Sequence, residues 1–192
     1  MAVAGQEFCI NLHTGLVEQA RQSDCTHYDD REGSEIDLLV IHNISLPPKQ
    51  FGGPYIDQLF AGRLNPQEHE FFKEIAGIRV SSHLLIRRDG GLVQYVPLHK
   101  RAWHAGLSSF QGRDKCNDFS IGIELEGADD IPYEPQQYEV LAKLTRLIMS
   151  AYPAITKERI TGHSDIAPGR KTDPGPAFDW DYFRKTLAGK PR

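Results

Sequence analysis

Short apolar runs in the first half of the chain predict β-strands. Residues 38–41 (LLVI) form a run rich in branched side chains just before His42, which is typical of a strand buried on both faces. Residues 82–86 and 92–96 flank the turn sequence Asp89-Gly90-Gly91. They therefore predict an antiparallel hairpin.

Residues 120–125 alternate between two kinds of side chain and predict a further strand. Its apolar side chains share one face and are Ile121, Ile123 and Leu125. Gly122 and Glu124 share the other face. Because Gly122 has no side chain, we expect that face to be open enough for a substrate to approach Glu124.

Helical spacing of apolar residues predicts one long helix over residues 135–152. Pro54 can begin a short helix that ends near Gly62, and the sequence Asn65-Pro66-Gln67-Glu68 resembles the cap and first turn of another. A last helix is predicted over residues 179–187. Strands and helices are interleaved, so we expect an α/β fold: a single domain with a mixed central β-sheet flanked by helices.

Composition narrows the class of protein. The chain has 192 residues, of which 40% are hydrophobic and 25% charged, which fits one globular domain with a continuous core. The net charge of −4 provides no basic stripe for nucleic acid. No uncharged run approaches the roughly 18 residues of a membrane span, and the first residues lack a signal-peptide pattern. An odd number of widely spaced cysteines, Cys9, Cys25 and Cys116, favours a reducing cytoplasm over a disulfide framework.

Two histidines and a carboxylate could together bind a catalytic metal. His42 follows a buried run, His163 lies in a polar turn after the long helix, and Asp173 precedes a stiff Pro-Gly-Pro sequence. This is the ligand count of catalytic zinc, which keeps a fourth position for water. Spacing alone, however, favours an ordinary surface turn around Asp173. Asp165 is a rival carboxylate that would suit non-haem iron, but no histidine follows His163 to complete such a site.

Glu124 and Lys171 could supply chemistry beside such a metal. A carboxylate next to an activated water can act as general base and then protonate the leaving amine. By strand periodicity, Glu126 has an equal claim to this role. Lys171 lies two residues before Asp173, where a fixed ammonium could stabilise the oxyanion of a tetrahedral intermediate.

Five motifs occur in a characteristic order. They are residues 40–45 (VIHNIS), 82–90 (SHLLIRRDG), 101–106 (RAWHAG), 117–127 (NDFSIGIELEG) and 162–175, which runs from Gly162-His163 to Lys171-Thr172-Asp173-Pro174-Gly175. Together they closely resemble the AmpD family of cytoplasmic N-acetylmuramoyl-L-alanine amidases, within the peptidoglycan-recognition and phage-lysozyme amidase superfamily. The likeness runs from about Leu38 to Trp180.

The resemblance implies a role for each candidate residue. His42, His163 and Asp173 would bind zinc, Glu124 would activate water, and Lys171 would stabilise the oxyanion. The implied fold has zinc at the floor of a groove beside the mixed sheet. We accordingly expect an amidase catalytic domain over residues 37–187, preceded by an N-terminal surface segment over residues 1–36.

The implied substrates and partners are 1,6-anhydro-N-acetylmuramyl peptides, fragments that arise during cell-wall recycling. The enzyme would cut the amide between the lactyl group and L-alanine, and would thereby lower the muropeptide that induces β-lactamase. We expect a cytoplasmic monomer without nucleic-acid or membrane partners. The expected substrate contacts are Asn43, Arg79, Trp103, which could stack on the sugar, His104, and Lys115, where many relatives carry arginine. For His104 and for His83, groove lining, support of the ligands and a purely structural role all remain open.

Two alternative functions follow from the same superfamily. A non-catalytic muropeptide receptor would commonly lack a metal ligand, whereas none is missing here. A secreted amidase that lyses the intact wall would carry a signal sequence, and we expect none.

Overall fold

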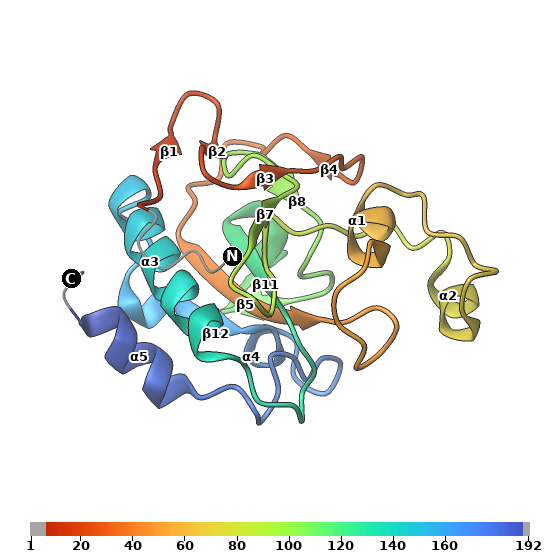
Figure 1. Ribbon diagram of the computed structural model, residues 1–192. Helices are drawn as coiled ribbons and strands as arrows, with labels where there is room; N and C mark the ends of the chain where they lie inside the picture. Colours follow the sequence, from red (N-terminus) through yellow and green to blue (C-terminus); the bar gives the residue numbers. More distant parts are fainter. Residues whose placement is uncertain (1–6, 190–192) are drawn as a thin grey trace.

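A six-stranded mixed β-sheet forms the centre of the computed structural model, which describes residues 7–189 (Figure 1). Its strands are β3 (Arg21–Gln22), β5 (Leu38–Ile44), β6 (Leu84–Ile86), β7 (Leu92–Gln94), β11 (Ser120–Glu126) and β12 (Ile160–Gly162). The order across the sheet is β12-β5-β11-β6-β7-β3. β12, β5, β11 and β6 are parallel, β7 is antiparallel to β6, and β3 is parallel to β7. The predicted mixed sheet and the hairpin are therefore confirmed.

Three small antiparallel pairs and several helices surround this sheet. The pairs are β1 (Ile10–Asn11) with β2 (Leu16–Val17), β4 (Tyr28–Asp29) with β8 (Arg101–Ala102), and β9 (Ser109–Phe110) with β10 (Arg113–Asp114). The α-helices are α1 (Tyr55–Phe60), α2 (Glu70–Ile75), α3 (Pro135–Ala151), α4 (His163–Ile166) and α5 (Trp180–Ala188). Two 3-10 turns complete the set, η1 (Cys116–Asp118) and η2 (Lys157–Arg159).

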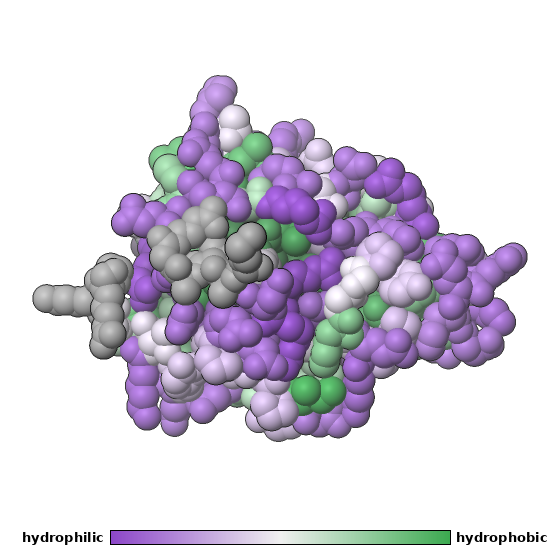
Figure 2. Space-filling model, viewed as in Figure 1, coloured by the Kyte–Doolittle hydropathy of each residue, from purple (hydrophilic) through white to green (hydrophobic). Residues whose placement is uncertain are grey.

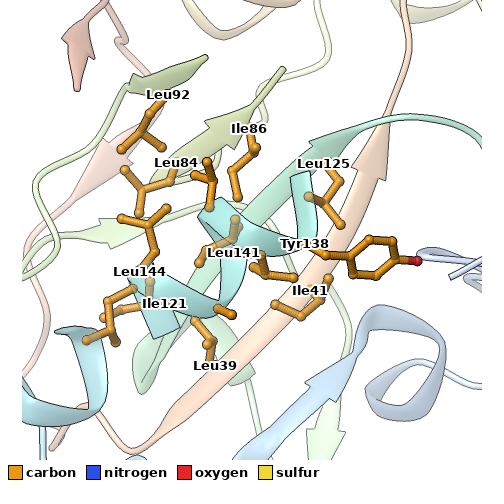
Figure 3. Packing of buried hydrophobic residues seen from close by; sticks show 14 of the residues in the cluster. Leu39, Ile41, Leu84, Ile86, Leu92, Ile121, Leu125, Tyr138, Leu141 and Leu144 are labelled. Atoms are coloured by element: carbon orange, nitrogen blue, oxygen red, sulfur yellow. The ribbon is translucent and has the colours of Figure 1, made fainter. Parts of the chain in front are cut away.

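One face of the sheet is covered by α3, with α5 packed beside it (Figure 1). Figure 3 shows the apolar side of α3 against three neighbouring strands, through Tyr138, Leu141 and Leu144 of the helix and Leu39, Ile41, Leu84, Ile86, Ile121 and Leu125 of the sheet. Burial of these side chains is the main force that fixes the register, because a shift by one residue would turn the apolar set away from the helix. The predicted long helix and the predicted apolar face of β11 are confirmed.

The opposite face of the sheet carries the polar candidates. Leu38 and Val40 of β5 pack there with Ile166 of α4, and α1 and α2 cover the β6–β7 side of this face. Because side chains alternate along a strand, His42 lies on the same face as Val40. The site is therefore built on the face of the sheet that α3 leaves free.

Two element boundaries differ from expectation. β5 does not end before His42 but continues to Ile44, because β11 pairs with it along its whole length. α2 begins at Glu70 rather than near Pro66. The side chain of Asn65 accepts a hydrogen bond from the N–H of Gln67 and closes a local turn, a known competitor of helix initiation. His69 caps the helix instead, with Nδ1 accepting from the N–H of Phe71.

The polar stretch before residue 37 is not confined to the surface. β3 adds to the edge of the central sheet. The guanidinium of Arg31 reaches inward and donates to the backbone carbonyls of Asn117, Asp118 and Ser120. The boundary between an N-terminal segment and a catalytic domain stays a prediction, and residues 1–6 of the predicted N-terminal segment lie outside the described residues.

Hydrophilic residues cover most of the molecular face seen in Figure 2. Among the described helices, none has the length and apolar character needed to cross a bilayer.

Candidate active site

Three side chains from distant parts of the sequence meet on the free face of the sheet. Nδ1 of His42, Nδ1 of His163 and Oδ2 of Asp173 lie 3.0 Å from one another. Both histidines are buried and Asp173 is half-buried. The structure thus brings together the three residues that the sequence suggested as metal ligands.

The topology of the sheet explains this convergence. His42 is on β5, and His163 is the first residue of α4, directly after the neighbouring strand β12. Asp173 is fixed from its backbone, since its carbonyl accepts a hydrogen bond of 2.9 Å from the N–H of Ser164. Each ligand therefore comes from a different segment, and a backbone hydrogen bond joins the segment of Asp173 to that of His163.

The donor set fits a divalent cation. Nε2 of His163 donates to the backbone carbonyl of Ala105 at 3.1 Å, and a carbonyl can only accept. A neutral His163 ring therefore presents an unprotonated Nδ1 to Asp173, and two lone pairs 3.0 Å apart repel unless a cation lies between them. In tetrahedral zinc sites with bonds of about 2.0–2.1 Å, ligand atoms are about 3.3 Å apart, close to the spacing of this triad.

The pKa shifts of two of the ligands, Asp173 and His42, agree with this fit. Burial alone would raise the pKa of Asp173, but its contacts with His163 and His42 hold that pKa below the ordinary value. Burial lowers the pKa of His42. An ionised carboxylate and neutral imidazoles are the forms that bind metal.

Glu124 lies beside the triad as a buried carboxylate. The parallel register of β11 and β5 places it directly across from His42. Among the described residues, none hydrogen-bonds its Oε2 atom. Burial raises the pKa of Glu124 well above its ordinary value, the nearby Asp173 raises it further, and the charge of Lys171 opposes this. An unpartnered buried carboxyl group with a raised pKa is typical of a group that exchanges protons with a substrate or a water molecule.

The two rival carboxylates are engaged elsewhere. Oε1 of Glu126 accepts from the N–H of Gly52 and from Arg87, and Oε2 accepts from the N–H of Arg88. Oδ2 of Asp165 accepts from Thr161 and from the N–H of Gly162, at the start of α4. Both carboxylates thus have structural partners, and Asp165 does not belong to the cluster of potential ligands.

A cavity of about 750 Å³ opens beside the triad, and its lining includes Asn43, Phe71, Lys171 and Asp173. Lys171 is exposed there. The amide nitrogen of Asn43 donates to Asp129 at 2.8 Å and to the carbonyl of Pro174 at 3.1 Å. Asn43 therefore also ties β5 to the segment that follows Asp173.

Residues 32–176 match the sequence profile of the family described as N-acetylmuramoyl-L-alanine amidase. The chain belongs to this amidase family. It is 61% identical over 174 residues to the 1,6-anhydro-N-acetylmuramyl-L-alanine amidase AmpD of Escherichia coli K12, covering 90% of this chain and 94% of that protein. It is 54% identical over 178 residues to the AmpD of Haemophilus influenzae, covering 92% of this chain and 97% of that one.

Solved structures agree with this assignment. A crystal structure of a selenomethionine derivative of AmpD superimposes with a TM-score of 0.90 at 55% identity, covering 93% of this amidase and 99% of that chain. The solution structure of Citrobacter freundii AmpD gives a TM-score of 0.65 at 57% identity, covering 89% and 91% of the two chains. The mixed sheet flanked by helices is therefore the fold of this family.

Of the other predicted substrate contacts of the amidase, Lys115 lines a cavity, whereas Trp103 and Arg79 line neither this cavity nor the one beside the triad. Lys115 is exposed and lines a second cavity, of about 550 Å³, together with Leu107. Arg170 lines both this cavity and the one beside the triad. Trp103 is half-buried, with the guanidinium of Arg79 5.0 Å from its ring centroid.

His104 occupies the space that the sequence suggested was open. Its side chain is buried, and a Cβ atom added to Gly122 would lie 2.6 Å from its ring. The expectation that Gly122 leaves room for substrate is therefore wrong, because the glycine makes room for this imidazole. Burial holds the pKa of His104 well below its ordinary value. Nδ1 of His104 lies 2.9 Å from Nε2 of His42, so His104 contacts a ligand of the triad.

Sequence reasoning missed two residues that hold the backbone of the segment 104–107. Oδ1 of Asn117 accepts from the backbone N–H groups of His104 and Ala105. Arg170 donates to the carbonyls of Ala105 and Leu107 at 2.6 and 2.7 Å. Both residues lie within motifs that the sequence offered, but their backbone partners depend on the folded path of the chain. No periodic pattern could have revealed them.

Proposed function

We propose that this amidase uses a zinc ion held by His42, His163 and Asp173 to hydrolyse 1,6-anhydro-N-acetylmuramyl peptides. The bond cut is the amide between the lactyl group of the sugar and L-alanine, in cytoplasmic recycling of the cell wall. The single observation that carries the proposal is the triad of ligand atoms 3.0 Å apart beside Oε2 of Glu124, for which the described part of the chain provides no hydrogen-bond partner. The relatives that match about nine-tenths of the chain are named 1,6-anhydro-N-acetylmuramyl-L-alanine amidases. Their names support this choice of substrate.

Each residue has a distinct task in this proposal. Zinc, when bound, supplies a Lewis acid that lowers the pKa of a water ligand to about 7 and polarises the scissile carbonyl. Oε2 of Glu124 takes the proton of the attacking water and then delivers it to the alanine nitrogen as the amide bond breaks. The raised pKa of Glu124 suits both steps, because the group must accept a proton and also give it up near neutral pH.

Lys171 stabilises the negative charge that develops on the carbonyl oxygen. Lys171 lines the cavity that Asp173 also lines, so its ammonium can reach the space in which the reacting carbonyl would sit. Preorganised positive charge at such a position lowers the barrier because it interacts more strongly with the oxyanion than with the neutral carbonyl.

The two neighbouring cavities suggest how an extended substrate is bound. Arg170 lines both, so a ligand with a sugar at one end and an acidic peptide at the other could extend from one cavity to the other. Like Arg170, Lys115 is an exposed cation of the second cavity. It offers a point charge to a peptide carboxylate rather than the bidentate fork of an arginine.

We expect zinc-loaded protein to release the free peptide from a purified anhydromuropeptide, which mass spectrometry of the digest would detect. Protein treated with a chelator is the matched control and should regain activity when zinc is restored. Binding measured by calorimetry without any product would instead indicate a receptor. Hydrolysis of intact sacculi at the rate of the soluble fragment would contradict the assignment to recycling.

Lys171→Met is expected to lower kcat by roughly 10- to 100-fold with little change in KM. The effect should fall below the 10²–10³-fold that a buried oxyanion donor supplies, because water screens an exposed charge. Single-turnover kinetics of zinc-loaded protein would measure it. Lys49→Met is a matched control, since Lys49 lines the same cavity but is paired with Asp130. An unchanged kcat in Lys171→Met would exclude the oxyanion role.

A further inference from the structure

A chain of buried polar atoms leads away from the triad. Nε2 of His42 lies 2.9 Å from Nδ1 of His104. Nε2 of His104 lies 3.1 Å from Oγ of Ser120, and this hydroxyl lies 2.5 Å from the backbone carbonyl of Cys116. The side chains of His42, His104 and Ser120 are all buried, with exposed fractions of 1%, 8% and 0%.

The end of this chain fixes the position of every proton in it. The carbonyl of Cys116 can only accept, so the hydroxyl of Ser120 donates to it. The oxygen of Ser120 then accepts from Nε2–H of His104. A neutral imidazole carries one N–H, so Nδ1 of His104 is an acceptor and must receive the N–H on Nε2 of His42.

The opposite order is unfavourable. If Ser120 donated to His104, its oxygen would face the carbonyl of Cys116 across 2.5 Å with no proton between them, and two acceptors at that distance repel. The order of donors and acceptors that the carbonyl of Cys116 sets therefore leaves Nδ1 of His42 without a proton. This is the atom that faces His163 and Asp173.

We propose that His104 and Ser120 are positioning residues that hold His42 in the tautomer and ring orientation needed to bind the metal. This inference rests on the proposed zinc site and adds residues to which that site assigned no role. Partners of this kind on the remote nitrogen of a ligating histidine raise metal affinity by fixing the ligand before binding.

The second histidine ligand depends on the same short segment. His163 donates to the carbonyl of Ala105, the residue after His104, and Asn117 holds both backbone N–H groups of this pair. Gly122 lets the ring of His104 lie against β11. One segment thus orients both imidazoles of the triad, which explains why His104 is buried rather than presented to substrate.

Ser120→Ala tests the proposal with a matched control in Ser82→Ala. Both serines are fully buried, and both donate to a backbone carbonyl: Ser120 to Cys116 and Ser82 to Gly122. Of the two, Ser120 also contacts His104. Competition with a chromophoric zinc chelator should show affinity about tenfold weaker in Ser120→Ala and unchanged in Ser82→Ala.

Two substitutions at position 104 separate the acceptor from the shape of the ring. His104→Leu removes the acceptor and should weaken zinc binding by about 10- to 100-fold. His104→Asn can place an amide oxygen near the position of Nδ1, and we expect it to restore much of that affinity. Nitrogen-15 NMR of the zinc-loaded protein should find the proton of His42 on Nε2 in the wild type and in Ser82→Ala.

Equal zinc affinity in wild type, Ser120→Ala and His104→Leu would overturn the proposal, as would a proton on Nδ1 of His104 in the wild type. A structural role alone would lower the melting temperature of Ser120→Ala and Ser82→Ala alike without separating their zinc affinities. Failure of the zinc site itself is distinguishable, because the wild type would then bind no zinc.

Discussion

Asp173→Ala is expected to lose zinc and, with it, essentially all hydrolysis. The carboxylate supplies one of three protein ligands and the only negative charge among them, so its removal should weaken zinc binding by more than the roughly 10–100-fold that loss of an outer partner costs. Metal analysis after gel filtration, together with a muropeptide digest, would measure both effects.

Asp165→Ala is the matched control for this change. Asp165 lies eight residues before Asp173 in the same loop-rich region and accepts hydrogen bonds at the start of α4. Its loss should cost about 0.5–2 kcal/mol of stability, as removal of a helix cap does, while zinc stays bound. Full zinc occupancy in Asp173→Ala would show that another residue is the ligand, and Asp165 would be the first to examine.

Glu124→Gln is expected to keep zinc and lose turnover by about 10²- to 10⁴-fold, the usual contribution of a general acid–base group. The amide has nearly the shape of the carboxyl group but cannot accept the proton of water. Zinc content and kcat, measured on the same preparation, would separate the two effects. Glu126→Gln provides a contrast, because its carboxylate is bonded to Arg87 and to backbone N–H groups and should affect stability more than rate. Near-normal turnover in Glu124→Gln would assign the base to another group.

Glu124→Gln should also stabilise the metal-free protein relative to wild type, and by more as the pH rises. The pKa of Glu124 is raised in the folded state, so the unfolded chain releases this proton at a lower pH than the folded one. Stability is therefore lost as pH rises above the unfolded pKa of about 4.3. Glutamine does not titrate, and thermal unfolding should show its advantage over wild type growing as the pH rises from about 4 towards the raised pKa of folded Glu124. A difference in melting temperature between the variant and the wild type that stays constant as the pH rises would contradict this.

The central strands, the hairpin and the long helix followed from local patterns in the sequence. The apolar residues that alternate along 120–125 predict a strand with one buried face, and that face is buried against α3. The start of α2 did not follow, because a proline after Asn65 is as compatible with a side-chain turn as with a helix. Which of the two forms depends on how residues 65–69 meet the rest of the fold.

The ligand triad was available from motifs, but its supporting contacts were not. A histidine in a motif carries no sign of whether it faces substrate or another side chain. His104 contacts His42 because the segment after β8 crosses over β11 at Gly122. That crossing is a tertiary feature, and a glycine in a strand equally permits an open groove.

The inward-pointing guanidinium of Arg31 has a practical consequence. It lies one residue before the stretch that matches the family profile, yet it donates to the carbonyls of Asn117 and Ser120. The side chains at these two ends of the loop 117–120 contact the His104–Ala105 segment that orients the imidazoles. Anyone who transplants this hydrolytic unit into another polypeptide should begin the graft upstream of Arg31, since a cut at the profile boundary would discard an anchor of the loop beneath the metal site.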